Sequence, residues 1–316
     1  MKGSIMNKKR AIAIIIAVAM SFGLAACAPG QQKTPPPAPP APPENTGNFQ
    51  FTPENFPCMG GSLAALPLGE AVVAVALGIP RSEAGDYILF EGSTTSNYYE
   101  LMDGRFDILL AYEPSEEIVL YAQNADFELE MTAIGRDALV FIANRDNPVQ
   151  SITDAQIRDV YSGKITNWKE LGGSDSEIIA YQRNKDSGSQ TLFDKLIDLG
   201  DDLMSPPSEL EVGSMIGLLE VVSDYDNSID ALGYTVFYYL ANMEKKKLER
   251  TRILAVDGVT CSNETIRSGE YPYVNDFYAV IPKALPADDP ARVLYNWICS
   301  EQGKELAERE NYVSVS

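Results

Sequence analysis

The sequence predicts an α/β protein with a mostly parallel central sheet. From residue 51 onward, strand-like runs alternate with helix-like runs, which is the pattern of strand–helix layering. About 265 residues follow a proline-rich segment, enough for one large domain or two medium domains with cores of their own. Small hydroxyl residues beside glycine recur before the helix-like runs, as is typical of helix N-termini.

Residues 1–27 have the pattern of a secretory signal. A basic stretch, KKR, precedes an apolar run at 11–26 that is short for a membrane span and ends in LAAC. This boundary resembles the lipobox of bacterial lipoproteins, which implies that Cys27 becomes the lipidated, palmitate-carrying N-terminus. Because MNKKR alone makes a complete basic region, the start codon is open between Met1 and Met6.

Residues 28–50 form the expected linker between the signal and the folded part. The stretch from Pro35 to Pro43 is almost entirely proline, which favours an extended polyproline II spacer of about 3 Å per residue. Such a spacer holds the folded part away from a membrane. A disordered tail without a role is the alternative.

The first half of the folded part predicts two helices and three strands. Helices are expected at 61–78, where apolar residues follow Gly-Ser, and at 93–104, where Ser-Thr-Thr is a typical helix start. Strands are expected at 86–92, 105–114 and 137–144, which are short apolar runs rich in aliphatic and aromatic residues.

The second half continues the alternation. Apolar residues at helical spacing predict helices, and uninterrupted apolar runs predict strands. In chain order these are a helix at 153–163, a strand at 177–183, helices beginning at 187–189 and at 214, a strand at 230–241, a strand at 276–282 and a closing helix at 291–309.

Composition excludes several classes of function. The chain has a net charge of −20 and no histidine. Its excess of negative charge does not suit nucleic acid, whose phosphates are bound by clustered cations. Without histidine it lacks the usual catalytic base and the commonest metal ligand. Neither a Walker-type phosphate loop nor a Ser-x-x-Lys motif occurs. We therefore expect no enzyme, no cofactor, no metal and no nucleic-acid partner.

Three cysteines follow Cys27, namely Cys58, Cys261 and Cys299. None forms a Cys-x-x-Cys pair, which disfavours a structural zinc site. Outside the cytoplasm one disulfide can form among the three, and its pairing stays open.

The segment RNKDSGSQTLF, at 183–193, carries the strongest sign of a binding site. Its Ser-Gly-Ser stands at a helix start, where unpaired N–H groups and the helix dipole favour an anion, and Arg183 lies just upstream. Simple capping by Ser187 is the other interpretation. Similar junctions occur at Gly61-Ser62, Gly92-Ser93-Thr94 and Gly213-Ser214. They either cap separate helices or converge at the carboxyl ends of the strands, where ligands of α/β sheets bind.

Five stretches resemble, in order, the phosphate-binding group of ABC-transporter substrate-binding lipoproteins. They are GGSLAALPL, VYSGKITNWKELGG, RNKDSGSQTLF, ALGYTVFYY and SGEYPYVNDFYAVI. The resemblance implies a periplasmic-binding-protein-like fold of type II, in which two lobes hold the ligand in the cleft between them. We expect lobe 1 at 51–137 and 241–316 and lobe 2 at 138–240.

The resemblance also implies the residues that bind the anion. They are Ser62, Leu63, Ser93, Thr94, Arg183, Asp186, Ser187, Gly188 and Ser189. In the family an acidic residue two positions after the arginine accepts the proton of hydrogen phosphate and repels sulfate. Here that position is Lys185, and Asp186 follows it, so we expect Asp186 to take over this role.

These features together predict a monomeric receptor on the extracytoplasmic face of the cell membrane, held there by its lipid anchor. It is expected to bind an oxyanion, phosphate first, and to deliver it to ABC permease subunits. Two alternatives stay open: a receptor for another oxyanion or a small carboxylate on the same fold, and a signalling or adhesion lipoprotein that has lost transport.

Overall fold

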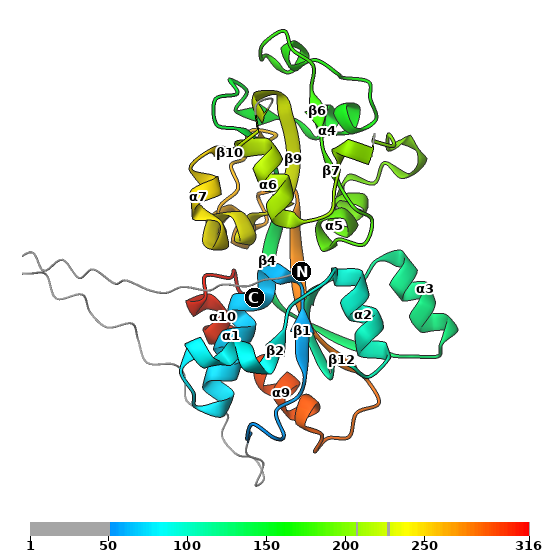
Figure 1. Ribbon diagram of the computed structural model, residues 1–316, viewed down its shortest axis with the longest axis vertical. Coiled ribbons are helices and arrows are strands. Elements are labelled where there is room, and N and C mark those ends of the chain that lie inside the picture. The colour runs from blue at the N-terminus through cyan, green and yellow to red at the C-terminus, as the bar shows by residue number, and fades with distance from the viewer. Residues whose placement is uncertain (1–50, 207, 226–227, 316) are drawn as a thin grey trace, which may run out of the picture. The chain divides into compact units, whose positions relative to one another are not determined.

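One long strand, β4 (Leu129–Asn144), belongs to both halves of the folded chain in this computed structural model, which describes residues 51–206, 208–225 and 228–315 (Figure 1). The expected signal at 1–27, with Cys27, and the linker at 28–50 lie outside these residues. Residues 129–138 of β4 pair with β12 (Val274–Pro282), and residues 139–143 pair with β9 (Ala231–Val236). The change of partner makes β4 the connection between the two halves.

The main sheet has eight strands in the order β2-β1-β3-β12-β4-β9-β6, with β10 also paired to β4. The remaining strands of this sheet are β1 (Met59–Gly61), β2 (Ile88–Leu89), β3 (Ile108–Tyr112), β6 (Ile179–Ala180) and β10 (Thr251–Ile253). Two small sheets pair β5 (Ser151–Ile152) with β11 (Ala255–Val256), and β7 (Gln182–Arg183) with β8 (Glu211–Val212).

The expectation of a mostly parallel sheet is wrong for the middle of this sheet. β1 is parallel to β2 and β3, and β6 is parallel to β9. The central strands β12 and β4 are antiparallel to their neighbours, so β9 is antiparallel to β4 although it is parallel to β6. Alternating strands and helices predict parallel pairing only where a helix connects neighbouring strands, and β4 and β12 are far apart in the chain.

Ten α-helices occur among the described residues: α1 (Leu66–Leu77), α2 (Thr94–Met102), α3 (Glu116–Asn124), α4 (Asp154–Tyr161), α5 (Gly188–Ile197), α6 (Met215–Ser223), α7 (Lys245–Leu248), α8 (Asn263–Ser268), α9 (Pro290–Ile298) and α10 (Glu301–Arg309). The predicted starts near 93, 187 and 214 are confirmed within one residue. No single helix in the described part is long and apolar enough to cross a membrane. The helical stretch Leu63–Leu77, which includes α1, passes that test only together with the 3₁₀ segment Arg81–Tyr87, and the two are bent by 99°.

Several elements differ from the expectation. The strand expected at 230–241 ends at Val236, and Tyr239–Met243 is a π-helix. The strand expected at 177–183 is two short strands, β6 and β7, in different sheets.

The strand expected at 86–92 is reduced to β2, because Arg81–Tyr87 is a 3₁₀ helix. The single closing helix is two helices that break at Cys299 and Ser300. At this break the backbones lie so close that a Cβ on Gly303 would be 2.1 Å from the Ile298 carbonyl oxygen. Helix α3 was not expected.

Strand pairing indicates that the chain returns to the first half later than at residue 241, where the boundary was expected. β10 pairs with Ile142–Asn144 of β4, and β11 pairs with β5. Residues 251–256 therefore extend the second half, although the sequence placed them in lobe 1. The chain rejoins the first half at β12, which lies between β3 and β4.

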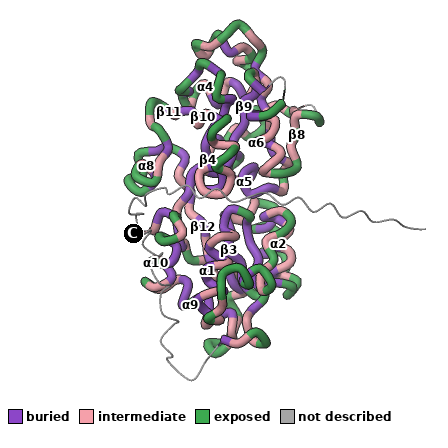
Figure 2. Tube along the Cα trace, turned by 60° about the vertical axis from the view of Figure 1, so that its left-hand side comes forward, coloured by how far each residue is buried: buried purple, intermediate pink, exposed green. Residues whose placement is uncertain are grey.

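Aromatic rings fill the core of the second half. Tyr161, Phe193 and Tyr234 are buried beside Phe141 of β4, with ring centroids 4.5–6.3 Å apart. Figure 2 shows β9 as buried throughout, and β4 is buried from Asp137 to Asn144. Edge-to-face and stacked ring contacts of this kind add to the hydrophobic stabilisation of a core. This packing holds α5, through Phe193, against β4 and β9.

Asp137 is a buried carboxylate at the point where β4 changes partner. It accepts hydrogen bonds from the Tyr112 hydroxyl at 2.7 Å, the Ala138 N–H at 2.8 Å and the Tyr238 N–H at 2.9 Å. Burial raises its pKa from the ordinary value of 3.8 to about 6, against the opposing effect of these three donors. Asp137 thereby joins β3, β4 and the segment after β9 at one point.

We expect Asp137→Ala to lower the free energy of unfolding by about 2–4 kcal/mol at pH 7, because three buried donors lose their acceptor. Since the pKa of Asp137 is higher in the folded state, the parent takes up a proton on folding below about pH 6 and gains stability from this group as the pH falls. The deficit of the variant should therefore be larger at pH 5 than at pH 7.

Urea denaturation at both pH values measures this difference. Asp288→Ala, at an exposed position, is the matched control. A deficit for Asp137→Ala no larger than that of the control, or one that shrinks as the pH falls, would contradict the assigned role.

Candidate functional site

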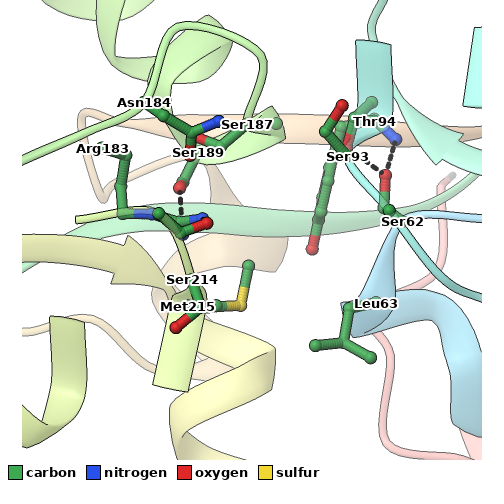
Figure 3. A pocket seen from close by; sticks show the side chains of 14 residues that line it. Ser62, Leu63, Ser93, Thr94, Arg183, Asn184, Ser187, Ser189, Ser214 and Met215 are labelled. Atoms are coloured by element: carbon green, nitrogen blue, oxygen red, sulfur yellow. Dashed lines mark hydrogen bonds between the residues drawn. The ribbon is translucent and has the colours of Figure 1, made fainter. Parts of the chain in front are cut away.

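A cavity of about 190 Å³ lies where four helix starts meet (Figure 3). Its walls are formed by Ser62, Leu63, Gly92, Ser93, Thr94, Tyr112, Arg183, Asn184, Ser187, Gly188, Ser189, Gly213, Ser214 and Met215. Eight of the nine residues expected to bind an anion are in this set, and Asp186 is not. The helix starts therefore converge, and they are not merely separate caps.

Ser62 and Thr94 join two of these helix starts. Their hydroxyl oxygens are 2.9 Å apart, and the Ser62 hydroxyl also accepts the N–H of Tyr112 at 3.2 Å. Ser62 follows β1 and makes no side-chain cap to its own 3₁₀ turn, Leu63–Ala65. Its hydroxyl is thus used to shape the cavity wall rather than to cap a helix.

Ser93 is the N-cap of α2. Its hydroxyl accepts the N–H of Ser96 at 3.0 Å, and its own N–H is donated to the Ser96 hydroxyl at 3.0 Å. This capping box fixes the start of α2 and uses the cap's own hydrogen-bonding groups. The positive end of the α2 dipole is directed at the cavity that Ser93 and Thr94 line.

At the start of α5, Ser-Gly-Ser both caps the helix and leaves N–H groups free for an anion, so each of the two interpretations is correct in part. The Ser187 hydroxyl caps the helix by accepting the N–H of Gln190 at 3.1 Å. The N–H groups of Gly188 and Ser189, however, have no acceptor within the described residues. Both residues line the cavity, so these two donors are available to a ligand.

Gly188 is also required by the close approach of the two cavity walls. A Cβ at this position would lie 2.5 Å from the Thr94 hydroxyl oxygen. Nearby, the Thr95 N–H donates to the Asp186 carbonyl oxygen at 3.3 Å, so α2 and the loop before α5 are in direct contact. Any side chain at Gly188 would push the walls apart.

Arg183 supplies the one formal positive charge of the cavity wall, and it is 93% buried, with 7% of its surface exposed. Its Nε donates to the Val212 carbonyl at 2.9 Å, and its terminal nitrogens donate to the Ser189 hydroxyl at 3.2 Å and the Gly213 carbonyl at 3.4 Å. Burial lowers the pKa of Arg183 to about 10, so the side chain is still a cation at neutral pH.

No carboxylate in the described part of the chain forms an ion pair with Arg183. A buried charge without a counter-charge is costly, and proteins normally pair it. Neutral partners hold this guanidinium in place and leave its charge unbalanced. The cavity is therefore prepared for an anion.

A fourth helix start, at α6, lies beside Arg183 because β7 pairs with β8. Ser214 caps α6 by accepting the N–H of Gly217 at 3.0 Å, and Ser214 and Met215 line the cavity. The Gly213-Ser214 junction is visible in the sequence, although these residues were not among the expected ligands. Tyr112 gives no such signal, since it is an ordinary aromatic residue at the end of a strand.

Asp186 does not lie where the selectivity role needs it. Its side chain is half-buried and does not line the cavity, and its carbonyl accepts the Thr95 N–H described above. The residue thus contributes to the contact between the walls. The expected acceptance of a ligand proton by its carboxylate has no support from this geometry.

The chemistry of the wall suits binding of a small anion. Its residues are hydroxyl donors, first-turn N–H groups, an amide and one guanidinium, and none of the 14 is acidic. Among the described residues no group of three or more histidine, cysteine or acidic side chains is placed to hold a metal ion. The three described cysteines are free thiols, so no disulfide forms in this structure.

Two solved structures share this architecture. A structure described as a phosphate ABC transporter substrate-binding protein with bound phosphate, from Clostridium perfringens, has a TM-score of 0.66 and 24% identity over 83% of this chain and 100% of that one. An ABC-type phosphate transport receptor from Vibrio cholerae has a TM-score of 0.60 and 21% identity over 82% and 99%. At this identity the likeness establishes the fold, and the predicted periplasmic-binding-protein-like fold is confirmed.

Sequence relatives carry the name phosphate-binding protein PstS. The relative from Bacillus subtilis is 29% identical over 45% of this chain and 43% of its own length. The relative from Borreliella burgdorferi is 25% identical over 58% and 65%, and that from Staphylococcus haemolyticus is 23% identical over 71% and 70%. The match to the first two thus spans less than two thirds of their length.

A family model gives the assignment that these partial matches leave incomplete. The PBP superfamily domain matches residues 82–302, which include both ends of β4, all of β12 and most of the cavity wall. Because residues 82–302 are more than half of this chain, the chain belongs to the PBP superfamily.

Proposed function

We propose that this protein is an extracytoplasmic lipoprotein receptor that binds inorganic phosphate in the cavity and delivers it to an ABC permease. The buried, unpaired Arg183 in a wall of donors is the observation that carries the proposal. The names of the sequence relatives support phosphate as the ligand. The chain acts as a binding protein and not as an enzyme.

Local hydrogen bonds are strong enough to overcome the net charge of −20. At physiological ionic strength the Debye length is about 8 Å, so distant carboxylates are largely screened. Each charge-assisted hydrogen bond contributes roughly 1.5–3 kcal/mol. The donors that we assign to the oxyanion are Arg183, the N–H groups of Gly188 and Ser189, and whichever hydroxyl of the Ser62–Thr94 pair does not donate to the other.

Binding between two walls also suggests how the ligand is enclosed. The first wall comes from the starts of the 3₁₀ turn and α2, and the second from the starts of α5 and α6. The Thr95 N–H to Asp186 carbonyl bond and the ion pair of Lys195 with Glu113 already link the two sides. We propose that the ligand joins them further and that the lobes separate when it leaves.

The anchor, the location and the partners of the proposal rest on the sequence alone. The lipobox-like boundary at Cys27 and the proline-rich linker suit a monomer held on the outer face of the cell membrane. The permease subunits are expected partners because transport receptors of this superfamily deliver their ligand to a membrane complex. Nucleic acid is not an expected partner.

Phosphate should raise the stability of the signal-free protein. At one hundred times its dissociation constant, a ligand that binds only the folded state stabilises it by about 2.7 kcal/mol. A thermal melt with and without millimolar phosphate at constant ionic strength measures the shift, with chloride as the control anion. An unchanged melting temperature in phosphate, arsenate, sulfate and molybdate would rule out an oxyanion receptor.

Arg183→Ala should weaken phosphate binding by roughly thirtyfold to a thousandfold, or about 2–4 kcal/mol, because it removes the charged partner of the ligand. The Ser187 cap stays intact, so the start of α5 should persist. Calorimetric titration gives the dissociation constants. Arg145→Ala, which removes an equal charge at an exposed position, is the matched control and should bind as the parent does. Equal affinity for parent and Arg183→Ala would reject the site.

Cys27→Ser should abolish lipidation, because the thiol that accepts the lipid is removed. The variant protein is then expected in the soluble fraction or as the unprocessed precursor. Fractionation with metabolic palmitate labelling distinguishes these outcomes from the parent. Cys299→Ser, far along the chain, is the control for loss of a thiol. Normal cleavage and labelling of Cys27→Ser would show that the anchor lies elsewhere.

A further inference from the structure

The cavity wall contains no carboxylate, which limits how it can distinguish one oxyanion from another. Three acids that adjoin or contact residues of the wall do not line it. Asp137 lies behind Tyr112 and accepts three hydrogen bonds, Glu113 pairs with Lys195 and accepts the Tyr278 hydroxyl, and Asp186 lies outside the wall. No ionised oxygen therefore faces the ligand.

This absence matters because a carboxylate is an acceptor only. It binds the O–H of a protonated oxyanion and repels an oxyanion that carries no proton. Phosphate keeps a proton near neutral pH, whereas sulfate is fully ionised. A wall of neutral and cationic donors gives both anions the same partners, so it has no repulsive element directed against sulfate.

Asn184 supplies the one side-chain amide of the wall. Its backbone is fixed, since its carbonyl accepts the Ser187 N–H at 3.0 Å. Its side-chain Oδ1 is buried and has no hydrogen-bond partner among the described residues. Figure 3 shows Asn184 beside Arg183 and Ser189, on the side of the cavity opposite Ser93 and Thr94. Asn184 as a whole is half-buried, so the cost concerns its Oδ1 alone, and a donor from a ligand would remove that cost.

An amide suits either form of anion because it carries both an acceptor and donors. Rotation by half a turn about its last side-chain bond exchanges the oxygen for the NH₂ group. The oxygen can accept the proton of hydrogen phosphate, and the NH₂ group can donate to an oxygen of sulfate. The same side chain can therefore complete the coordination of both ligands.

We propose that Asn184 determines the specificity of this site and makes it a receptor for tetrahedral oxyanions whether or not they carry a proton. This inference rests on the proposed function, because it concerns the ligand class of the same cavity. It gives Asn184 the acceptor function that the sequence had suggested for Asp186, but without the repulsion of sulfate that a carboxylate would add.

One experiment tests the proposed function and this inference separately. It is a calorimetric titration of the signal-free protein with phosphate and with sulfate, at pH 7.5 and constant ionic strength. The phosphate titration alone tests the proposed function. The ratio of the two dissociation constants tests this inference, and we expect it to lie within about tenfold. A preference for phosphate of about a hundredfold or more would overturn the inference and leave the proposed function standing. Binding of neither anion would contradict both.

The variant Asn184→Asp tests whether Asn184 sets the ratio of the phosphate and sulfate dissociation constants. A carboxylate at this position should weaken sulfate binding about a hundredfold more than phosphate binding, because the like charge faces a ligand without a proton. Asn263→Asp, which adds the same charge at an exposed position in α8, should leave the ratio unchanged. An unchanged ratio in Asn184→Asp, in a variant that melts as the parent does, would show that Asn184 does not set specificity.

The variant Asn184→Ala distinguishes two causes of a change in affinity, the charge of the new carboxylate and the loss of the amide. It removes the amide without adding a charge, so phosphate and sulfate should weaken together and their ratio should stay near that of the parent. A selective loss of phosphate in this variant would instead indicate that the amide serves only as an acceptor, which contradicts the dual role.

Discussion

The buried guanidinium of Arg183 is the interaction around which the cavity is organised. It is held by two carbonyl oxygens and a serine hydroxyl, which orient the charge but do not neutralise it. The carbonyls belong to Val212 and Gly213, which the pairing of β7 with β8 brings alongside. The hydroxyl belongs to Ser189 in the first turn of α5. Arg183 thus holds the starts of α5 and α6 together, and its positive charge is available to pair with the ligand.

The opposite wall depends on a different constraint, the passage of β4 through both halves of the folded chain. β4 exchanges β12 for β9 next to Asp137, and Asp137 accepts the hydroxyl of Tyr112. Tyr112 in turn lines the cavity and donates its N–H to Ser62. The connection between the halves is therefore tied to the cavity wall by three hydrogen-bonded residues. Movement of one half against the other would act directly on this wall.

Much of the site was predictable because helix capping is local chemistry. A serine cap and the N–H group it satisfies are three residues apart, as in Ser187 with Gln190 and Ser214 with Gly217. The segment RNKDSGSQTLF therefore indicated a helix start, free N–H groups and a nearby cation, and the structure has all three. The family resemblance added the other wall, with Ser62, Leu63, Ser93 and Thr94, all of which line the cavity.

The sequence by itself determined the elements whose causes lie within a few residues: the helix starts, the buried strand at 137–144 and the cation beside Ser-Gly-Ser. Only the tertiary structure decided which strands are antiparallel, where the chain returns to the first half, and which side chains face the ligand. Asp186 and Asn184 differ in position by two residues, yet only Asn184 lies in the wall. That difference depends on the contact of α2 with the loop before α5 and on strand pairing across long separations, neither of which leaves a local pattern in the sequence.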